Sequence, residues 1–225
     1  GDEAGAWFRG DVAGVLAARH LDADWVVTPV SSNTALEKSG WFDATRRTRI
    51  GSPYVIEGMA EAAAAGGRRV VGFEANGGFM TWQDLQYEDR TLTALPTRDA
   101  TIVILSLLLA ARAGGLRLSE LRQTLPPRFT ASDRLKDFPA ELGRERLAAL
   151  RAEGAPAIEA LFPELGPVRE VDETDGLRVT FARGDIVHLR PSGNAPELRC
   201  YNEAATERRA SELNARCLAV LERWR

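Results

Sequence analysis

The sequence predicts an α/β domain followed by a smaller α+β domain, and two patterns indicate this division. In the first half, β-rich segments alternate with helical segments, which predicts a mostly parallel sheet covered by helices. In the last third, short β-like segments are separated by turn signals, as in antiparallel hairpins. With 225 residues, 44% of them hydrophobic, the chain can bury one large core or two small ones.

The first domain is expected to span residues 11–125. Its elements alternate in the order helix 11–23, strand 24–30, helix 34–40, strand 44–50, helix 54–65, strand 69–73 and buried helix 99–113. Polar residues that suit helix starts are Asp11, Ser31, Ser32, and Ser52 with Pro53 behind it. A glycine-rich turn over 72–78 follows the third strand.

Residues 126–165 are expected to form a linker that contains one helix, and residues 166–225 the second domain. The linker begins at two prolines, continues with a stretch over 128–135 that is able to adopt an extended conformation, and holds an amphipathic helix over 142–153. The second domain is expected to contain strands at 168–171, 177–181, 186–189 and 198–201, then a helix from about residue 206. That helix places apolar side chains along one face.

Composition excludes several classes of function. Lys and Arg number 29 against 32 Asp and Glu, so a net charge of −3 offers no sequence-wide surface for nucleic acid or an anionic membrane. The two cysteines do not form a C-x-x-C pair and the chain has only two histidines, so the sequence shows neither the ligand pattern of a zinc site nor a disulfide framework; this favours a reduced, cytoplasmic setting. The longest apolar run, 102–111, is too short to span a bilayer. The chain opens at Gly1 without an initiator Met or a signal-like segment, which suggests processing or deliberate shortening.

A turn over 190–196 has the residue types that hold a phosphate. A phosphate dianion prefers a guanidinium fork, a hydroxyl, and backbone N–H groups in a concave turn. The residues here that supply such groups are Arg190, Ser192, Gly193, Asn194 and the nearby Arg199. An ordinary β-turn with a solvated arginine has a similar composition, and on composition alone that interpretation is favoured.

Two further turns follow predicted strands of the first domain. Glu74 and Asn76 offer an acceptor and an amide to sugar hydroxyls, although a simple Gly-Gly turn is the alternative. Arg47, Arg49 and Ser52 lie beside a helix amino terminus, which favours anions. A basic strand edge that resists aggregation is an equally good explanation of the two arginines.

The ordered set of turns resembles the α-D-phosphohexomutase (phosphomannomutase/phosphoglucomutase) family. Residues 190–196 are similar to its phosphate signature R-P-S-G-T-E-P, and Arg199 matches the downstream arginine. Residues 72–78 resemble its G-E-x-S-G sugar loop, and residues 28–33 and 49–53 resemble its substrate-facing loops. Residues 1–10 resemble the tail of the preceding domain, so the likeness covers the family's third and fourth domains only.

The resemblance implies a fold and a set of roles. The second domain would be an antiparallel sheet with helices, similar to the TATA-binding protein. The sugar would be held by Glu74, Asn76, Arg49 and Ser52, and its phosphate by Arg190, Ser192, Gly193, Asn194 and Arg199. Such enzymes interconvert hexose 1- and 6-phosphates, of mannose or glucose, through a phosphoserine, Mg²⁺ and a hexose 1,6-bisphosphate. The guanidinium groups and the glutamate–asparagine corner would then converge on one hexose monophosphate.

The sequence departs from the family pattern in ways that affect catalysis. Asn194 and Ala195 replace the Thr and Glu of the signature, and Asn76 replaces the usual serine of the sugar loop. The chain contains neither a phosphoserine loop nor a D-G-D-x-D-R metal loop, so it is expected to hold no catalytic residue or metal and to be inactive without its N-terminal domains. The alternatives are a stand-alone sugar-phosphate-binding module and, disfavoured by the lack of G-x-G-x-x-G, a nucleotide-binding protein.

Overall fold

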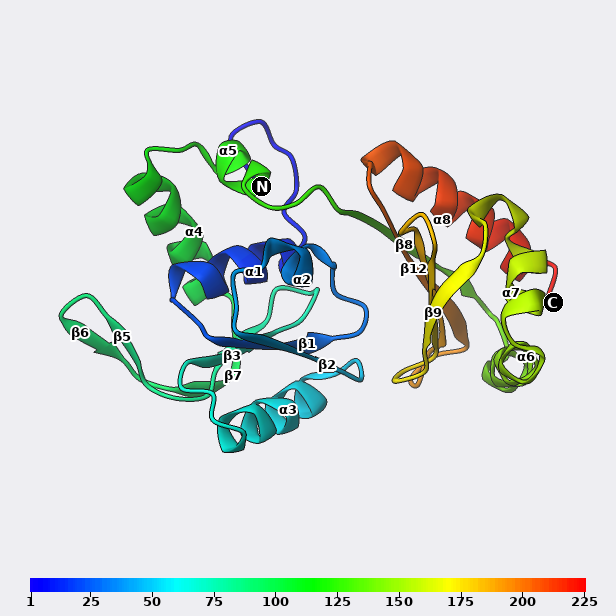
Figure 1. Ribbon diagram of the computed structural model, residues 1–225, viewed down its shortest axis with the longest axis horizontal. Helices are drawn as coiled ribbons and strands as arrows, with labels where there is room; N and C mark the ends of the chain where they lie inside the picture. Colours follow the sequence, from blue (N-terminus) through cyan, green and yellow to red (C-terminus); the bar gives the residue numbers. More distant parts are fainter. The chain divides into compact units, whose positions relative to one another are not determined.

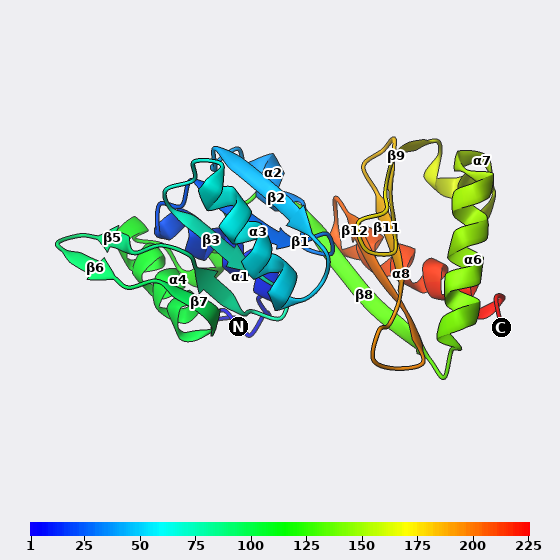
Figure 2. The ribbon, with the colours of Figure 1, turned by 90° about the horizontal axis from the view of Figure 1, so that it is seen from below.

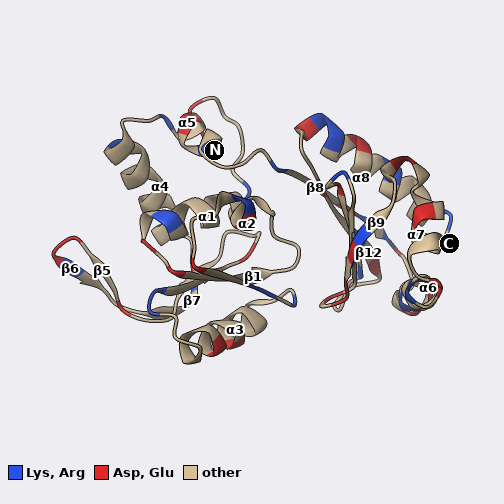
Figure 3. Ribbon diagram, in the orientation of Figure 1, with Lys and Arg blue, Asp and Glu red and all other residues tan.

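A computed structural model describes residues 1–225, and the chain divides into two compact units. Unit 1 comprises residues Gly1–Pro127 and unit 2 comprises residues Arg128–Arg225. Each unit has a five-stranded sheet and a hydrophobic core of its own. Charged residues of both signs are spread over the elements of each unit (Figure 3).

Unit 1 alternates helices and strands as the sequence predicts. Its elements are α1 (Gly10–His20), β1 (Trp25–Pro29), α2 (Ala35–Ser39), β2 (Ala44–Thr48), α3 (Ser52–Ala64), β3 (Val70–Phe73), β4 (Phe79–Thr81), β5 (Leu85–Tyr87), β6 (Arg90–Leu92), β7 (Leu95–Asp99), α4 (Thr101–Gly114) and α5 (Leu118–Gln123). The sheet has the order β2-β1-β3-β4-β7. Helices α1 and α4 lie on one face of the sheet and α3 lies on the other (Figure 1).

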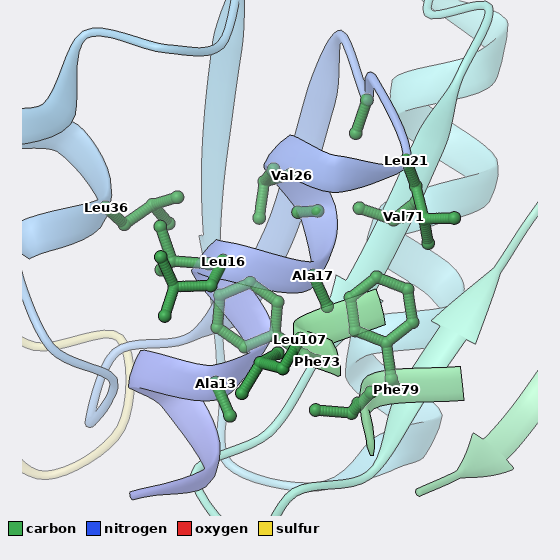
Figure 4. Close-up of a cluster of buried hydrophobic side chains, with 14 of the residues drawn as sticks. Ala13, Leu16, Ala17, Leu21, Val26, Leu36, Val71, Phe73, Phe79 and Leu107 are labelled. Atoms are coloured by element: carbon green, nitrogen blue, oxygen red, sulfur yellow. The ribbon is translucent and has the colours of Figure 1, made fainter. Parts of the chain in front are cut away.

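Alternation along the central strands accounts for the two helical layers. On β1, Val26 joins the core beneath α1 and α4, whereas Val27 joins the core beneath α3. Neighbouring side chains of a strand point to opposite faces, so a continuous apolar run buries both faces. Phe73 and Phe79 stack in the first of these cores, where Leu16 and Leu107 also lie (Figure 4).

The sheet of unit 1 is mixed, with a parallel half that the sequence predicts and an antiparallel half that it does not. Strands β2, β1 and β3 are parallel, whereas β3–β4 and β4–β7 pair antiparallel, and β5 and β6 form a separate hairpin. Strands of three residues, such as β4, are too short to leave a period-two pattern. The sequence pattern therefore does not predict the antiparallel strands.

Several predicted caps are wrong, although the helices they belong to exist. Helix α1 begins at Gly10 with Arg9 as its N-cap, so Asp11 lies inside the first turn. Helix α3 begins at Ser52 with Gly51 as its N-cap. At α2 the backbone N–H of Ala35 donates to Asn33 Oδ1 at 2.8 Å, which is the role expected of Ser31 or Ser32.

Unit 2 is an antiparallel sheet with helices on one face. Its elements are β8 (Phe129–Lys136), α6 (Ala140–Glu153), α7 (Ala155–Leu161), a 3₁₀ turn (Pro163–Leu165), β9 (Val168–Asp172), β10 (Leu177–Phe181), β11 (Ile186–Pro191), β12 (Glu197–Ala204) and α8 (Glu207–Glu222). The sheet order is β8-β12-β11-β10-β9 (Figure 2). Helix α8 begins close to residue 206 as predicted, and Thr206 caps it, because its Oγ1 accepts from the Arg209 N–H at 3.2 Å.

The segment expected to be a linker, residues 126–165, instead belongs largely to unit 2. Strand β8 pairs with β12 over eight residue pairs, and so forms one edge of the sheet. Phe138, Leu147 and Ile158 lie in the core of unit 2, beside Cys200 and Cys217. Both cysteines are free and buried. None of the helices is long and apolar enough to cross a membrane.

Candidate functional site

The predicted sugar-binding residues follow strands that end at one edge of the sheet of unit 1. Strand β1 is parallel to β2 on one side and to β3 on the other, with Pro29 opposite Thr48 and Val27 opposite Gly72. Arg49 and Glu74 come directly after β2 and β3. Since neighbouring strands are about 4.8 Å apart, their backbones flank the end of β1 at about 10 Å from each other. This edge is the usual ligand position in an open α/β sheet.

Residues 74–78 form the tight turn between β3 and β4. The Glu74 N–H donates to the Gly78 carbonyl, and the Gly77 N–H donates to the Glu74 carbonyl, both at 3.0 Å. The Asn76 side chain accepts from the Gly78 N–H at 2.9 Å, and its amide lies 3.5 Å from Glu74 Oε2. The Glu74 side chain is largely buried, so the turn holds a carboxylate and an amide in fixed positions next to each other.

A glycine at the start of α1 packs against this turn. A Cβ placed on Gly10 would lie 2.2 Å from the Gly77 nitrogen and 2.6 Å from the Ala75 oxygen. The backbone of the helix start therefore packs directly against the backbone of the turn. Only glycine permits so close an approach.

Buried polar groups fix the neighbouring loop between β1 and α2. The Asp11 carboxylate, fully buried, accepts from the Asn33 N–H at 2.8 Å and pairs with Arg9. Thr28 Oγ1 donates to the Phe73 carbonyl at 2.8 Å and lies 2.7 Å from Ser32 Oγ. Residues 28–33 resemble a substrate-facing loop in sequence. These hydrogen bonds connect the loop to both α1 and β3.

Arg47, on β2, and Arg49, directly after β2, have different positions. Arg47 donates to the carbonyls of Pro29 and Ser32, at 2.9 and 2.8 Å, and pairs with Glu37, so it holds the loop together. Arg49 is exposed, and its guanidinium lies 4.9 Å from the centre of the Tyr54 ring. Of the two, Arg49 has the exposure that a ligand contact needs.

The predicted phosphate residues gather at the β11–β12 hairpin of unit 2. The Ser192 N–H donates to the Glu197 carbonyl at 2.8 Å and closes the loop, and Ser192 Oγ lies 3.4 Å from the Asn194 nitrogen. Gly193 and Asn194 are exposed, and a Cβ on Gly193 would meet nothing within 4 Å. The loop thus leaves open space beside its backbone at Gly193.

Arg190 and Arg199 lie directly opposite each other on β11 and β12. Opposite residues of an antiparallel pair point to the same face, which here is the face without helices. The Arg190 Nε is 2.9 Å from Asp175 Oδ2, and Arg199 donates from Nε and Nη2 to Glu197 Oε2 at 3.1 and 3.0 Å. Burial disfavours the charged form of Arg199, but its hydrogen bonds with Glu197 and Tyr201 raise the pKa of this guanidinium above its usual value.

Three residues of this site were missed by the sequence analysis. Asp175 pairs with Arg190, Glu197 pairs with Arg199, and Arg134 on β8 places its Nε 3.0 Å from Glu197 Oε1. Glu197 was detectable, because residues i and i+2 of a strand share a face. Asp175 and Arg134 were not, since only the strand pairing brings them to the hairpin.

His188 is buried in the middle of the same face. Its Nε2 lies 2.6 Å from the Asp175 carbonyl oxygen, and its Nδ1 has no hydrogen-bond partner. Burial lowers the pKa of His188 to about 4, although the bond to the Asp175 carbonyl opposes this shift. His188 is therefore a neutral packing group, and it supports the Asp175 turn that Arg190 contacts.

The structure contains no group of three or more His, Cys, Asp or Glu side chains that could hold a metal ion. The residues present therefore do not fit the Mg²⁺ that the resemblance implies, and no step of a reaction can be assigned to a metal held by this chain.

Two models of protein families match the chain. The α/β/α domain III of phosphoglucomutase/phosphomannomutase matches residues 9–129, and the C-terminal domain of the same enzymes matches residues 134–220. The second match begins inside β8, which agrees with the assignment of that strand to unit 2.

Relatives and solved structures agree with these matches. A phosphomannomutase of Sinorhizobium fredii is 43% identical over 220 residues, which are 98% of this chain and 46% of the relative. One of Salmonella muenchen is 40% identical over 94% of this chain and 44% of its own length. This chain thus spans less than half the length of these relatives.

Among solved structures, a phosphoglucomutase/phosphomannomutase family protein of Burkholderia thailandensis superimposes with a TM-score of 0.63 at 17% identity, over 96% of this chain and 42% of that one. An N-acetylphosphoglucosamine mutase of Aspergillus fumigatus, in complex with glucose 1,6-bisphosphate, gives a TM-score of 0.63 at 16% identity, over 98% and 44%. At such low identity these two likenesses show the fold alone.

Proposed function

Because the chain belongs to the phosphoglucomutase/phosphomannomutase family, we propose that it is the sugar- and phosphate-binding part of a hexose phosphate mutase. The substrate is a 1- or 6-phosphate of mannose or glucose, and the names of the relatives support mannose. The whole enzyme converts one phosphate position into the other and works in the cytoplasm.

The β11–β12 hairpin binds the phosphate that does not react. The observation that carries this proposal is the pair of opposed arginines, Arg190 and Arg199, at the base of a loop with open space beside Gly193. Guanidinium groups offer paired donors to phosphate oxygens, and Ser192 and the loop amides supply shorter-range donors. Asn194 replaces a threonine of the family signature and contributes an amide instead of a hydroxyl.

The 74–78 turn binds the sugar. Glu74 accepts hydrogen bonds from two hydroxyls and Asn76 donates to one, while Arg49 and Ser52 contact the ligand from the end of β2 and the start of α3. A largely buried carboxylate needs hydrogen-bond donors to offset its lost hydration. The sugar hydroxyl groups that both binding orientations of the ligand share supply these donors. This arrangement lets one site accept a bisphosphate in either direction.

The reactive groups come from a preceding region of a longer polypeptide. We propose that this region supplies the phosphoserine and the Mg²⁺ loop and that a hexose 1,6-bisphosphate is the intermediate. The lengths of the relatives support this proposal, as does the apolar surface of α4. Ile104, Leu105 and Leu108 on this helix are 60, 53 and 51% exposed, and α4 carries almost no charge (Figure 3). Such a patch is typical of a surface that another domain covers.

A cavity next to α4 also supports the proposal that another domain packs against this helix. It has a volume of about 470 Å³ and is lined by apolar residues of α4 and of the N-terminal segment, including Trp7 and Phe8, and it reaches Asn76 and Gly77. A domain that fills it would therefore contact the back of the sugar-binding turn.

The second candidate function is a stand-alone, non-catalytic module that binds sugar phosphates. Both candidates require binding of a hexose phosphate, and only the first requires turnover once a preceding region is supplied.

Calorimetry of the 225-residue chain with glucose 1-phosphate tests the binding. We expect weak binding that an Arg190→Ala substitution reduces at least tenfold, because the phosphate loses a paired donor. Gly193→Ala adds a methyl group to open space, so it should fold normally and still weaken binding by occupying the phosphate position. Equal affinity of all three proteins would overturn the assignment.

Turnover is measured in a second assay, with Mg²⁺ and glucose 1,6-bisphosphate present. The chain alone should give no glucose 6-phosphate, whereas a fusion to the N-terminal half of the Sinorhizobium relative should give it. A fusion that folds and binds substrate but does not turn it over would favour the module.

A further inference from the structure

Three arginines lie in one row across the sheet of unit 2. Arg190 on β11 is opposite Arg199 on β12, and Arg199 is opposite Arg134 on β8. Directly opposite side chains have Cβ atoms about 5 Å apart, and like charges in this position repel each other. The exposed fraction of the side chains rises along the row, from 16% for Arg190 to 35% for Arg199 and 49% for Arg134.

Two carboxylates offset the three positive charges of this row. Asp175 pairs with Arg190, and Glu197 is shared by the other two arginines: its Oε2 accepts from Arg199 and its Oε1 lies 3.0 Å from the Arg134 Nε. Three positive charges against two negative ones leave one positive charge. The row of three arginines therefore has an excess of positive charge over its two paired carboxylates, which favours binding of an anion.

Glu197 also competes with that anion. It occupies the Nε and one Nη group of Arg199, which are the donors of a guanidinium fork that a phosphate would use. Its side chain is only 16% exposed, so a Glu197 carboxylate displaced from Arg199 would stay close to the phosphate and repel it. Another residue must therefore keep the Glu197 carboxylate away from Arg199 when the phosphate binds.

We propose that Arg134 is a positioning residue that retains Glu197 when a phosphate takes its place on Arg199. This inference rests on the proposed function of the hairpin. In the free protein Glu197 bridges Arg134 and Arg199 and prevents their mutual repulsion. A phosphate dianion, with more charge than one carboxylate, takes over Arg199, while Glu197 keeps its bond to Arg134. Arg134 acts on phosphate affinity through Glu197 and makes no contact with the phosphate itself.

The two substitutions Arg134→Gln and Glu197→Gln test this relation in a double-mutant cycle. Inorganic phosphate is titrated calorimetrically into the full chain at about 0.15 M salt, where charges more than about 8 Å apart are largely screened. Arg134→Gln should weaken binding about threefold to tenfold, because Glu197 then stays on Arg199. Glu197→Gln should strengthen binding by a similar factor, because the competitor is neutral.

The double variant decides how Arg134 acts. If Arg134 acts through Glu197, most of the Arg134→Gln effect disappears when residue 197 is already Gln. Arg134→Lys, which keeps a positive charge beside Glu197, should restore most of the affinity. Arg208→Gln, at an exposed arginine of α8 that is paired only with Glu212, removes the same charge elsewhere and should leave affinity unchanged. Circular dichroism verifies that each variant is folded.

Three outcomes would overturn the inference. The first is that Arg134→Gln leaves phosphate affinity unchanged. The second is that Arg134→Gln lowers affinity by the same factor whether residue 197 is Glu or Gln. The third is that Arg208→Gln lowers affinity as much as Arg134→Gln does; each of these outcomes excludes a role of Arg134 through Glu197. A wild-type chain that does not bind phosphate, or binds it equally after Arg190→Ala, overturns the proposed function instead. The two failures are therefore distinguishable.

Discussion

At the scale of single residues, the candidate site is set by buried polar groups that position more exposed ones. Asp175 and Glu197 hold Arg190 and Arg199 on one face, and Asp11 holds the loop next to the 74–78 turn. The bonds of Glu197 to Arg199 and of Asp11 to the Asn33 N–H are charge-assisted hydrogen bonds, which are stronger and more directional than neutral ones. The ligand-facing side chains are thereby ordered before any ligand arrives.

The buried histidine of unit 2 makes stability depend on pH. His188 stays neutral in the folded protein down to pH of about 4, because burial lowers its pKa, whereas in the unfolded chain it takes up a proton near pH 6.5. The unfolded state therefore binds more protons between these values, and the free energy of unfolding falls as the pH drops through this window. At pH 5 the loss from this group is about 2 kcal/mol.

Urea unfolding of wild type and His188→Phe, at pH 7.5 and pH 5, measures this contribution. The variant keeps a buried ring that cannot titrate, so its loss of stability between the two pH values should be smaller by about 2 kcal/mol. His20→Gln, which removes the half-buried histidine of unit 1, should retain the His188 contribution. An identical pH dependence in wild type and His188→Phe would exclude a protonation penalty at this residue.

At the scale of elements, the site consists of turns whose geometry the flanking strands and helices fix. The 74–78 turn joins two antiparallel strands and rests on the start of α1, and the 192–196 loop joins β11 to β12. Both turns close with backbone hydrogen bonds of 2.8 to 3.0 Å. Their conformation therefore follows from the sheets that carry them.

The contact between α1 and the 74–78 turn is tested by Gly10→Ala. In an unhindered helix this substitution stabilises by about 1 kcal/mol. Here the new methyl group overlaps the backbone of residues 75 and 77, so we expect a loss of about 1–3 kcal/mol in the free energy of unfolding. Sugar phosphate binding should weaken as well, because the turn must move.

A matched control for this substitution exists in α6. A Cβ on Gly143 would meet its nearest neighbour, Pro191, at 3.4 Å, which is an ordinary contact. Gly143→Ala should therefore be neutral or stabilising in thermal unfolding. If Gly10→Ala behaved in the same way, the close packing of α1 against the turn would be disproved.

How far the sequence predicts these elements depends on their length and pattern. The helices 10–20, 52–64 and 101–114 and the strands β1 to β3 were predicted to within a few residues, because long apolar stretches and Gly or Pro signals mark them. The short strands β4 to β7 were missed. The sequence indicated that the segment of β8 is able to adopt an extended conformation, but it was assigned to a linker. Its partner strand β12 lies more than 60 residues away in sequence, so the pattern gave no sign of the pairing.

At the scale of the whole molecule, the chain consists of two units, and each carries one set of the predicted binding residues. Unit 1 carries a buried carboxylate and an amide in a turn, and unit 2 carries opposed arginines at a hairpin. The site residues themselves were predicted from motifs. The acidic partners that hold the arginines were mostly not, since strand register and not sequence order brings them together.

The most direct test of the account asks whether one ligand uses both turns. Amide signals of the ¹⁵N-labelled chain are followed by NMR during titration with glucose 1-phosphate and, separately, with inorganic phosphate. We predict that glucose 1-phosphate shifts the signals of residues 192–194 and 74–78 with a single dissociation constant, whereas inorganic phosphate shifts only the first set. Glucose 1-phosphate that leaves either turn unshifted, or that shifts the two turns with different dissociation constants, would contradict the account.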